Sequence, residues 1–242
     1  MLTAIVTGVS RGLGEALGAQ LLERGCRVVG IGRNTSARLG GDRYTFVRCD
    51  LGDAAALAER AAPAFAHIAA ERAEAICLIN NAATLEPVGV LGTLGSVDIA
   101  RSITVNLVAP IGLSSLFCNT FDDDAIDRRI INVSSGAAQS TLPGASLYCI
   151  AKAGLEMLTR SLAAEHPSPS FRAITLRPGI IDTDMQVFAR SQTENTLPSV
   201  DLFKGFHASG NLVPPDTVAR KVVDRLVFAA VEQGRTYSYA EL

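Results

Sequence analysis

A tyrosine and a lysine are the residues of this sequence best suited to acid–base chemistry. Tyr148 and Lys152 are four positions apart, which puts both side chains on one face of a helix, one turn from each other. A phenol with a pKa near ~10 is a poor acid–base catalyst at neutral pH, and a nearby ammonium group lowers that pKa. Lysine is scarce in this chain, so chance is a poor explanation for the pair. We expect a proton-transfer centre with Tyr148 as the acid or base.

A glycine-rich turn is the second feature with chemical meaning. Gly8, Gly12 and Gly14 follow a predicted strand over 2–7 and open a predicted helix over 12–24. Glycines at such a turn let the backbone approach a pyrophosphate, which then lies at the positive N-terminus of the helix. We expect a dinucleotide site here, although an ordinary strand-to-helix turn could contain the same residues.

The second predicted strand ends in residues that indicate which dinucleotide binds. An NAD-specific site places a carboxylate near this point, to bond the ribose 2′-hydroxyl. This sequence has Gly32 there, followed by Arg33, and Arg11 lies in the glycine turn. Two guanidinium groups without a carboxylate suit a 2′-phosphate. We therefore expect NADP(H) as cofactor; the alternative is that both arginines are solvated surface charges.

The composition argues against several other functions. A formal net charge of −2 is not that of a nucleic-acid binder. The five cysteines are widely spaced and the three histidines are scattered, which disfavours a disulfide framework and a metal site. The sequence has no recognisable signal peptide and no apolar run approaching ~18 residues. We expect a cytoplasmic protein without a metal, nucleic-acid or membrane partner.

The elements that position these residues follow from the hydrophobic pattern. Apolar segments predict strands over 2–7, 27–31, 44–48, 75–79, 129–133, 172–176 and 236–238. Segments of helical period predict helices over 12–24, 54–70, 105–119, 148–165 and 217–230, with a bend at Pro110. Apolar strands that alternate with helices are typical of an α/β fold, a doubly wound (Rossmann-type) parallel sheet with helices on both faces. We expect seven strands in one domain over 1–242, with the polar segment 186–212 as a substrate lid.

The motifs together resemble the short-chain dehydrogenase/reductase family. They occur in the family's order: Thr7-Gly8-x-x-x-Gly12-x-Gly14, Asn80-Asn81-Ala82-Ala83, Asn106, Ser135 and Tyr148-x-x-x-Lys152. Segments 78–82, 130–137 and 177–186 are most similar to the sepiapterin reductase and benzil reductase type. The resemblance implies hydride transfer between NADP(H) and the carbonyl or alcohol carbon of a small ketone or diketone.

The resemblance also implies a catalytic set of Asn106, Ser135, Tyr148 and Lys152. Ser135 would bond the substrate oxygen, and its distance of 13 positions from Tyr148 favours it over Ser134. Lys152 would also bond the nicotinamide ribose. Asn106 would keep its helix kinked and support a water chain to the lysine; the alternative is a core amide satisfied by backbone groups.

The family's cofactor contacts can be transferred position by position. Asp50 matches the residue that contacts adenine, and Asn80 and Ala82 match positions under the adenosine ribose. Thr183 matches a hydroxyl that contacts the cofactor, although it could serve only as a helix N-cap. The full expected set is Gly8, Ser10, Arg11, Gly12, Leu13, Gly14, Arg33, Asp50, Leu51, Asn80, Ala82, Tyr148, Lys152, Pro178, Gly179, Ile181 and Thr183.

This sequence departs from the family pattern at two places. Ala83 stands where the family usually has glycine, and residues 235–242 lack the Asp-Gly-Gly pattern of many tetrameric members. Family members pair the helices over 105–119 and 148–165, so a homodimer or homotetramer is expected.

Two rival functions remain open: a cofactor-sensing protein without catalysis, and a reductase for acyl-carrier or steroid substrates. The apolar candidates for the pocket wall are Leu85, Leu142, Met185 and Phe188.

Overall fold

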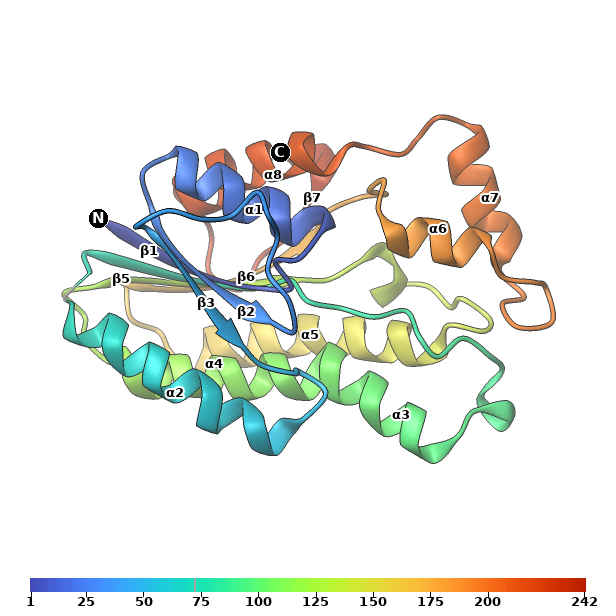
Figure 1. The fold of residues 1–242 in the computed structure, drawn as a ribbon, viewed down its shortest axis with the longest axis horizontal. Coiled ribbons are helices and arrows are strands. Elements are labelled where there is room, and N and C mark those ends of the chain that lie inside the picture. Colours follow the sequence, from blue (N-terminus) through green and yellow to red (C-terminus); the bar gives the residue numbers. More distant parts are fainter. Residues whose placement is uncertain (72) are drawn as a thin grey trace.

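A seven-stranded sheet lies between two layers of helices in the computed structural model, which describes residues 1–71 and 73–242 (Figure 1). All neighbouring strands pair in parallel, in the order β3-β2-β1-β4-β5-β6-β7. The strands are β1 (Leu2–Thr7), β2 (Arg27–Gly32), β3 (Tyr44–Arg48), β4 (Ala75–Asn80), β5 (Asp127–Val133), β6 (Phe171–Arg177) and β7 (Thr236–Ser238). The predicted fold class is confirmed, and the strand order reverses between β1 and β4, the point where ligands bind in such sheets.

Helices cover both faces of the sheet. The helices α1 (Gly12–Glu23) and α8 (Pro215–Val222) pack on one face, and α2 (Ala54–Ala70), α4 (Ala109–Thr120) and α5 (Ser146–Glu165) on the other (Figure 1). In β1, Ala4 and Val6 join the core under α1, whereas Ile5 joins the core under α2 and α4. Burial of alternate residues on opposite faces explains why the strand is apolar throughout.

Most element boundaries agree with the sequence pattern. Each predicted strand lies within two residues of its observed bounds, and the helix over 54–70 is reproduced. That helix begins after Asp53, whose side chain accepts hydrogen bonds from the backbone N–H groups of Ala55 and Ala56 at 3.1 and 3.0 Å. An N-cap carboxylate satisfies donors that the first helical turn leaves free.

The helix expected over 105–119 differs from the prediction. It is preceded by α3 (Ser96–Ile103) and a π-helical turn over Thr104–Val108, in which the Ala109 N–H bonds back to the Thr104 carbonyl. Pro110, the second residue of α4, therefore closely follows the π turn, and this irregular turn accompanies the missing N–H of the proline. The irregularity expected at Pro110 lies just before it, in the π turn.

The same stretch bears on the expectation about membrane spans. By length and composition alone, the continuous helix Ser96–Thr120 could cross a membrane. Polar residues interrupt its apolar run, so counting uninterrupted apolar residues missed it. Such a composition also describes a helix packed on a sheet, and Ala109, Leu113 and Phe117 are buried in the core.

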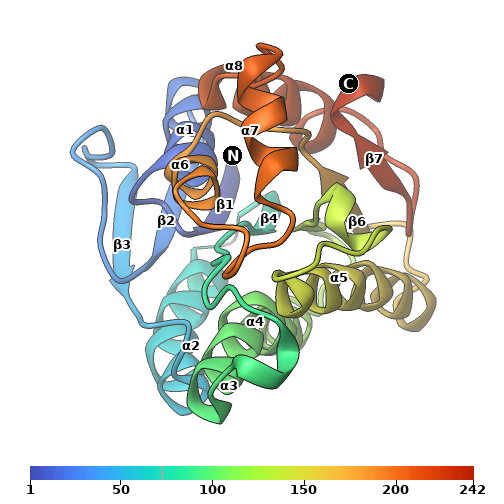
Figure 2. The ribbon, with the colours of Figure 1, turned by 90° about the vertical axis from the view of Figure 1, so that its right-hand side faces the viewer.

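The C-terminal third contains helices that the sequence pattern did not indicate. The segment 186–212 carries most of α6 (Asp184–Arg190) and all of α7 (Val200–Ala208), which project over the carboxyl edge of the sheet (Figure 2). The helix expected over 217–230 is α8 followed by a π-helical turn over Val223–Val227. Short 3₁₀ turns occur at Leu91–Thr93, Gly136–Ala138 and Tyr239–Glu241.

Candidate active site

The carboxyl ends of the strands bring the expected site residues to one edge of the sheet, which faces the viewer in Figure 2. Turns after β1, β2, β3, β4, β5 and β6 supply the glycine turn, Arg33, Asp50, Ala82, Ser135 and Gly179, respectively. Helical segments add Asn106, Tyr148 and Lys152. Parallel strands end at a common edge, so residues far apart in sequence become neighbours here.

Tyr148 and Lys152 lie in the first two turns of α5, on the side facing the sheet. Tyr148 is half-buried and Lys152 is 1% exposed. The Lys152 Nζ lies 5.4 Å from the centroid of the Tyr148 ring and donates a hydrogen bond to the Val133 carbonyl at 2.7 Å. The ammonium group is therefore fixed beneath the phenol, against the end of β5.

The two adjacent serines after β5 have different partners. The Ser135 side chain lies close enough to Tyr148 to lower the pKa of its phenol, and its Oγ accepts the Ala137 N–H at 3.2 Å. Ser134 Oγ lies 3.1 Å from the Lys152 carbonyl and 3.0 Å from Glu156 Oε1, which gives it a role in anchoring α5. Ser135 is thus the serine next to the phenol, as the spacing argument expected.

Burial dominates the protonation of the pair. It raises the pKa of Tyr148 to about 12, and the Ser135 side chain lowers it in part. It lowers the pKa of Lys152 to about 7. Burial thus disfavours the charged form of both groups, and the expected effect of the lysine on the pKa of Tyr148 stays a prediction. At neutral pH the phenol keeps its proton, the form that can protonate a developing alkoxide.

Asn106 is fully buried within the π turn. Its Oδ1 accepts the Thr84 N–H at 2.9 Å and its Nδ2 donates to the Thr84 carbonyl at 2.9 Å. Its Nδ2 also lies 3.4 Å from Ser102 Oγ, so these bonds fit both the expected support of an irregular helix and a core amide. The side chain ties the irregular helix to the segment after β4, beside the site.

The glycine turn forms a cradle that side chains would fill. Gly8 and Gly12 have φ values of +74° and +60°, which favour glycine. A Cβ on Gly14 would lie 2.1 Å from the Gly8 carbonyl oxygen, and one on Gly12 would lie 3.2 Å from Thr183 Cγ2. Thr183 is the N-cap residue of α6, but within the described part of the chain its hydroxyl makes no capping bond. Backbone N–H groups, a free hydroxyl and this close approach fit the pyrophosphate of a dinucleotide.

The arginines expected at a 2′-phosphate differ in their surroundings. Arg33 is exposed and has no ion-pair partner among residues 1–71 and 73–242. Arg11 is also exposed, but its NH1 lies 2.8 Å from Asp184 Oδ2 at the start of α6. Arg33 is free to bind a phosphate, whereas Arg11 would first have to leave Asp184.

The end of β4 and the residues after it lie beside the glycine turn. The side chain of Asn80 is buried and donates to Asn132 Oδ1 at 2.9 Å and to Ser114 Oγ at 3.2 Å, so only its backbone is available to a cofactor. The last residue of a strand alternates with its neighbours, and here it faces the helix layer. Asn81 instead reaches the glycine turn, where its Nδ2 donates to the Thr7 carbonyl at 2.9 Å. Ala82 packs against Gly8.

The adenosine end contains a residue that the sequence did not reveal. Asp50 accepts hydrogen bonds from Arg101 NH2 at 2.9 and 3.2 Å and from the Gly52 N–H at 2.9 Å. The Arg101 hydrogen bond, then that of Gly52, holds the pKa of Asp50 below its ordinary value. Leu51 is buried beside it. Arg101 lies 51 positions from Asp50, so no local motif could have indicated it.

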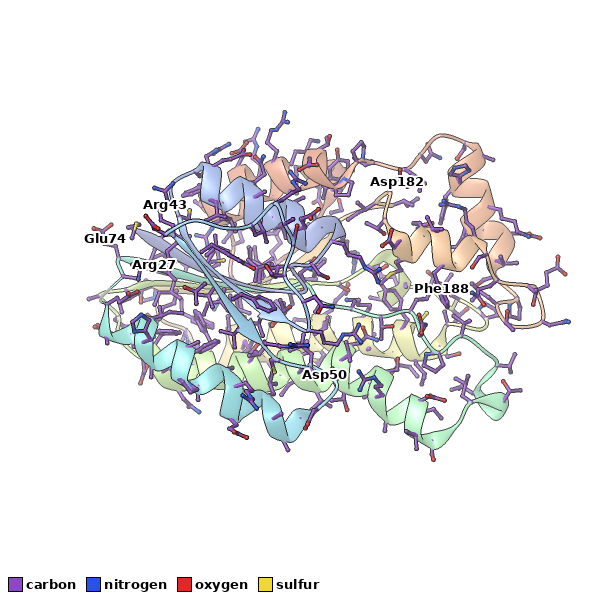
Figure 3. All side chains as sticks on the ribbon, in the orientation of Figure 1. Arg27, Arg43, Asp50, Glu74, Asp182 and Phe188 are labelled. Carbon is purple, nitrogen blue, oxygen red and sulfur yellow. The ribbon has the colours of Figure 1, made fainter. Side chains whose placement is uncertain are left out.

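An apolar cluster surrounds the outer side of Tyr148. All four wall candidates belong to it, with Leu85 buried and the other three partly exposed. Phe188 comes from α6, well away from Asp50 at the end of β3 (Figure 3). The other members with Tyr148 are Val88, Ala145, Ala189, Leu197, Val200 and Phe203. The 186–212 segment therefore supplies much of the apolar surface next to the phenol.

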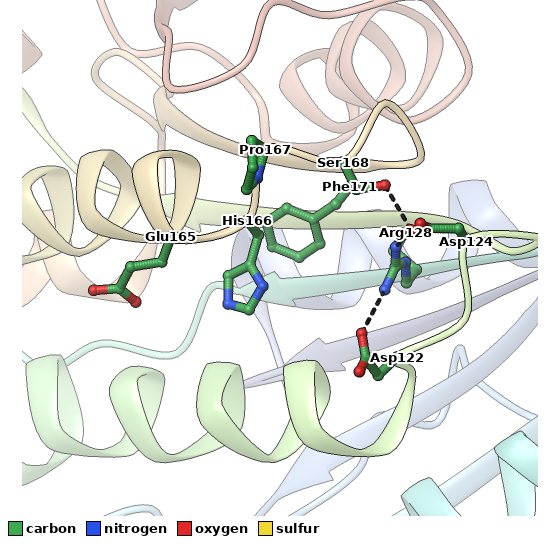
Figure 4. A pocket seen from close by; sticks show the side chains of 8 residues that line it. All are labelled: Asp122, Asp124, Arg128, Glu165, His166, Pro167, Ser168 and Phe171. Atoms are coloured by element: carbon green, nitrogen blue, oxygen red, sulfur yellow. Dashed lines mark hydrogen bonds and ion pairs between the residues drawn. The ribbon is translucent and has the colours of Figure 1, made fainter.

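A separate pocket of about 400 Å³ lies at the opposite edge, near the amino ends of β5 and β6 (Figure 4). Arg128 lines it and is 4% exposed. Its NH1 donates to the Phe121 carbonyl at 2.9 Å, and its NH2 donates to Ser170 Oγ at 2.9 Å and to Asp124. None of the expected site residues lines this pocket.

Comparisons with known proteins cover nearly the whole chain. The profile of the short chain dehydrogenase family matches residues 2–194. The chain is 32% identical to benzil reductase ((S)-benzoin forming) of Bacillus subtilis over 98% of both chains. It is 34% identical to sepiapterin reductase of Meriones unguiculatus, over 92% of this chain and 90% of that one. The solved structure of the KRED1-Pglu enzyme superposes with a TM-score of 0.83 at 26% identity, covering 98% of this chain and 100% of that chain.

Proposed function

Since this chain belongs to the short-chain dehydrogenase/reductase family, whose members are oxidoreductases that use nicotinamide cofactors, we propose that it is an NADPH-dependent carbonyl reductase. The observation that carries the proposal is the position of the Tyr148 ring above the buried Lys152, 5.4 Å from its Nζ, with the Ser135 side chain nearby and an apolar cluster beside it. This arrangement has a proton donor, a hydrogen-bond donor for a carbonyl oxygen and a surface for an apolar substrate.

The proposed chemistry assigns one task to each side chain. The cofactor, when bound, supplies the hydride for the carbonyl carbon. Ser135 donates a hydrogen bond to the carbonyl oxygen, where negative charge develops. Tyr148 transfers its hydroxyl proton to that oxygen. Lys152 lies under the ring and favours the phenolate that remains. At neutral pH the phenol is protonated, which is the form that donates a proton to the substrate oxygen in reduction.

The residues that would hold the cofactor run along the carboxyl edge. The glycine turn from Gly8 to Gly14 and the Thr183 hydroxyl suit the pyrophosphate. The unpaired Arg33 suits a 2′-phosphate, and this supports NADPH over NADH. Asp50 and Leu51 suit the adenine. Asn80 would act through its backbone, because its side chain is engaged elsewhere.

We propose a small, uncharged ketone or diketone as substrate. The cluster beside Tyr148 consists of apolar and aromatic side chains. Such a surface favours a ligand without charge, since burying an unpaired charge is costly. The 186–212 segment would act as the lid over this substrate. The name of the benzil reductase relative, an enzyme for an aromatic diketone, is consistent with this class.

We also propose that the protein forms homodimers or homotetramers in the cytoplasm. Val108 and Ile111 near the start of α4 and Ile150 and Met157 on α5 are exposed, at 39–54% of their surface. Exposed apolar side chains on adjacent helices are typical of an interface between subunits. Sedimentation of the wild type and of a Met157→Glu variant would test this, with dissociation expected for the variant.

A panel of ketones, diketones and pterins assayed with NADPH and NADH tests the proposed activity. We expect turnover with NADPH and a higher kcat/KM than with NADH. Ser135→Ala should lower kcat by about 100-fold, whereas Ser134→Ala should retain activity. Tight NADPH binding without turnover of any substrate would instead favour a cofactor-sensing protein. Acyl-carrier and steroid substrates are assayed beside this panel. Turnover of these substrates alone would favour a reductase for that substrate class.

A further inference from the structure

An ion pair at the adenosine end links two segments that are distant in the sequence. Arg101, near the end of α3, directs one nitrogen, NH2, between both oxygens of the Asp50 carboxylate. The side chains are 48% and 41% exposed, so the pair lies open at the surface. Arg33 lies close enough to add a smaller attraction to Asp50. The pair is therefore next to the proposed cofactor site and is accessible to a ligand.

Gly52 makes room for this arrangement. A Cβ built at position 52 would lie 2.6 Å from Arg101 NH1 and 2.9 Å from its Cζ. Any other residue at position 52 would push the guanidinium away from Asp50. The Gly52 N–H also donates to Asp50 Oδ1 at 2.9 Å. Gly52, in the turn after β3, therefore leaves space for the Arg101 guanidinium and donates a hydrogen bond to Asp50.

We propose that Arg101 is a positioning residue that fixes the Asp50 carboxylate to accept a hydrogen bond from the adenine amino group of the cofactor. This inference rests on the proposed function and adds a residue to it. An ionised carboxylate has about four acceptor positions, and the bonds from Arg101 and Gly52 occupy three of them. One position on Oδ2 stays available.

The charge of Arg101 has a second effect at this position. Arg33 also attracts the Asp50 carboxylate, more weakly than Arg101 does. The bonds from Arg101 keep the carboxylate from turning toward Arg33 and away from the adenine. Arg101 therefore lets Asp50 recognise adenine and leaves Arg33 free for phosphate.

The test compares two cofactors that differ only at the adenine amino group. NADPH carries that group, whereas reduced nicotinamide hypoxanthine dinucleotide phosphate has oxygen in its place. Dissociation constants are measured from the fluorescence of the bound reduced nicotinamide. The wild type should prefer NADPH about tenfold, as expected for one hydrogen bond to a charged group. Arg101→Leu should weaken NADPH binding by about five- to tenfold and leave the hypoxanthine analogue nearly unchanged.

Two further variants and a control keep the result specific. Gly52→Ala should reproduce the loss of preference, because its Cβ displaces the guanidinium. Arg101→Lys should retain part of the preference, because it keeps the charge. Arg43→Leu changes an exposed arginine near the opposite end of β3 and should leave both constants unchanged (Figure 3).

Any other outcome would overturn the proposed positioning role of Arg101. An equal loss for both cofactors in Arg101→Leu would assign Arg101 a purely structural role, and no loss would assign it none. A wild type that binds both cofactors equally would overturn the inference and leave the proposed function intact. A wild type that binds neither cofactor would overturn both.

Discussion

Arginines lie at both edges of the sheet, but they differ in how many of their hydrogen-bond donors have protein partners. At the amino edge, Arg129 is buried, and its NH1 donates to the carbonyls of Leu226, Val227 and Ala229 at 2.6, 3.0 and 3.0 Å. At the carboxyl edge, Arg33 is exposed, without an ion-pair partner in the described part of the chain. Buried polar groups need partners within the protein, whereas a ligand needs groups that the protein has left available. The first edge holds the fold together, and the second can bind.

Arg128 shows that the amino edge is not fully satisfied. Its NH1 and NH2 have protein partners, but within residues 1–71 and 73–242 its Nε has none. The pocket in Figure 4 lies beside this side chain. Arg128 is nevertheless buried and most of its donors have protein partners, whereas Arg33 at the carboxyl edge is exposed. Four predictions test the contrast.

The largest effect is expected at the carboxyl edge. Tyr148→Phe removes the hydroxyl that would protonate the substrate oxygen and should lower kcat by about 1000-fold. The free energy of unfolding should change by less than about 1 kcal/mol, because the side chain is half-buried and its ring keeps its place in the apolar cluster. Steady-state kinetics and urea unfolding measure the two quantities. A Tyr148→Phe protein that is much less stable and keeps its kcat would show that Tyr148 supports the fold and not the chemistry.

The amino edge should respond in the opposite way. Arg129→Met leaves three backbone carbonyls at the end of the last helical segment without their donor, and should destabilise the protein by about 3 kcal/mol. The kcat of the folded enzyme should be unchanged, and Arg129→Lys should recover part of the stability. Urea unfolding and activity at low temperature measure both. Lost activity at full stability would contradict the structural role.

Arg33 should affect only the choice of cofactor. Arg33→Ala removes a cation that has no ion-pair partner among the described residues, so the free energy of unfolding should be unchanged. The Kd for NADPH should rise about 10- to 30-fold, whereas the Kd for NADH should be unchanged. Titration of both cofactors measures this. Equal weakening of the two would show that Arg33 does not recognise the 2′-phosphate.

The last effect builds up gradually with pH and concerns Lys152, which is buried at the carboxyl edge. Its pKa falls to about 7 in the folded protein from a usual 10.5, so the unfolded chain binds one more proton between these values. Stability should therefore rise with pH above 7, by at most about 1.4 kcal/mol per pH unit from this group. The opposite shift of Tyr148 acts only above pH 10.

A comparison with Lys152→Met isolates that contribution. Urea unfolding of both proteins between pH 7 and 9.5 should show the wild type gaining stability relative to the variant. A difference that is constant over this range would mean that folding does not shift the pKa of Lys152. Methionine keeps most of the side-chain volume, so packing is matched.

The sequence predicts the parts of this protein that depend on local pattern. The strands, the helix capped by Asp53 and the glycine turn each have a repeating or capping signal within a few residues. Tyr148 and Ser135 follow from their mutual spacing, and their side chains are near each other in the structure. Their catalytic roles, and that of Lys152, stay predictions that the experiments above address.

The parts that were missed depend on tertiary packing. The helices α6 and α7 are short, and their apolar side chains face a cluster contributed by other segments. The direction of the Asn80 side chain depends on partners in β5 and α4. The pKa of Tyr148 depends on how deeply the whole fold buries it. Arg101 meets Asp50 only because α3 and the turn after β3 come together. None of these facts has a local sequence signal.

The strand order has a consequence for how the chain folds during synthesis. The first four strands along the chain, β1 to β4, are neighbours in the sheet, and β5, β6 and β7 then add one after another to the β4 side. A nascent chain leaves the ribosome at about 5–20 residues per second, and early segments can pair before later ones exist. Each new strand then meets an edge that is already formed. The glycine turn, Arg33 and Asp50 therefore emerge with the first half of the sheet, and Tyr148 and Lys152 join it only after β5 has been added.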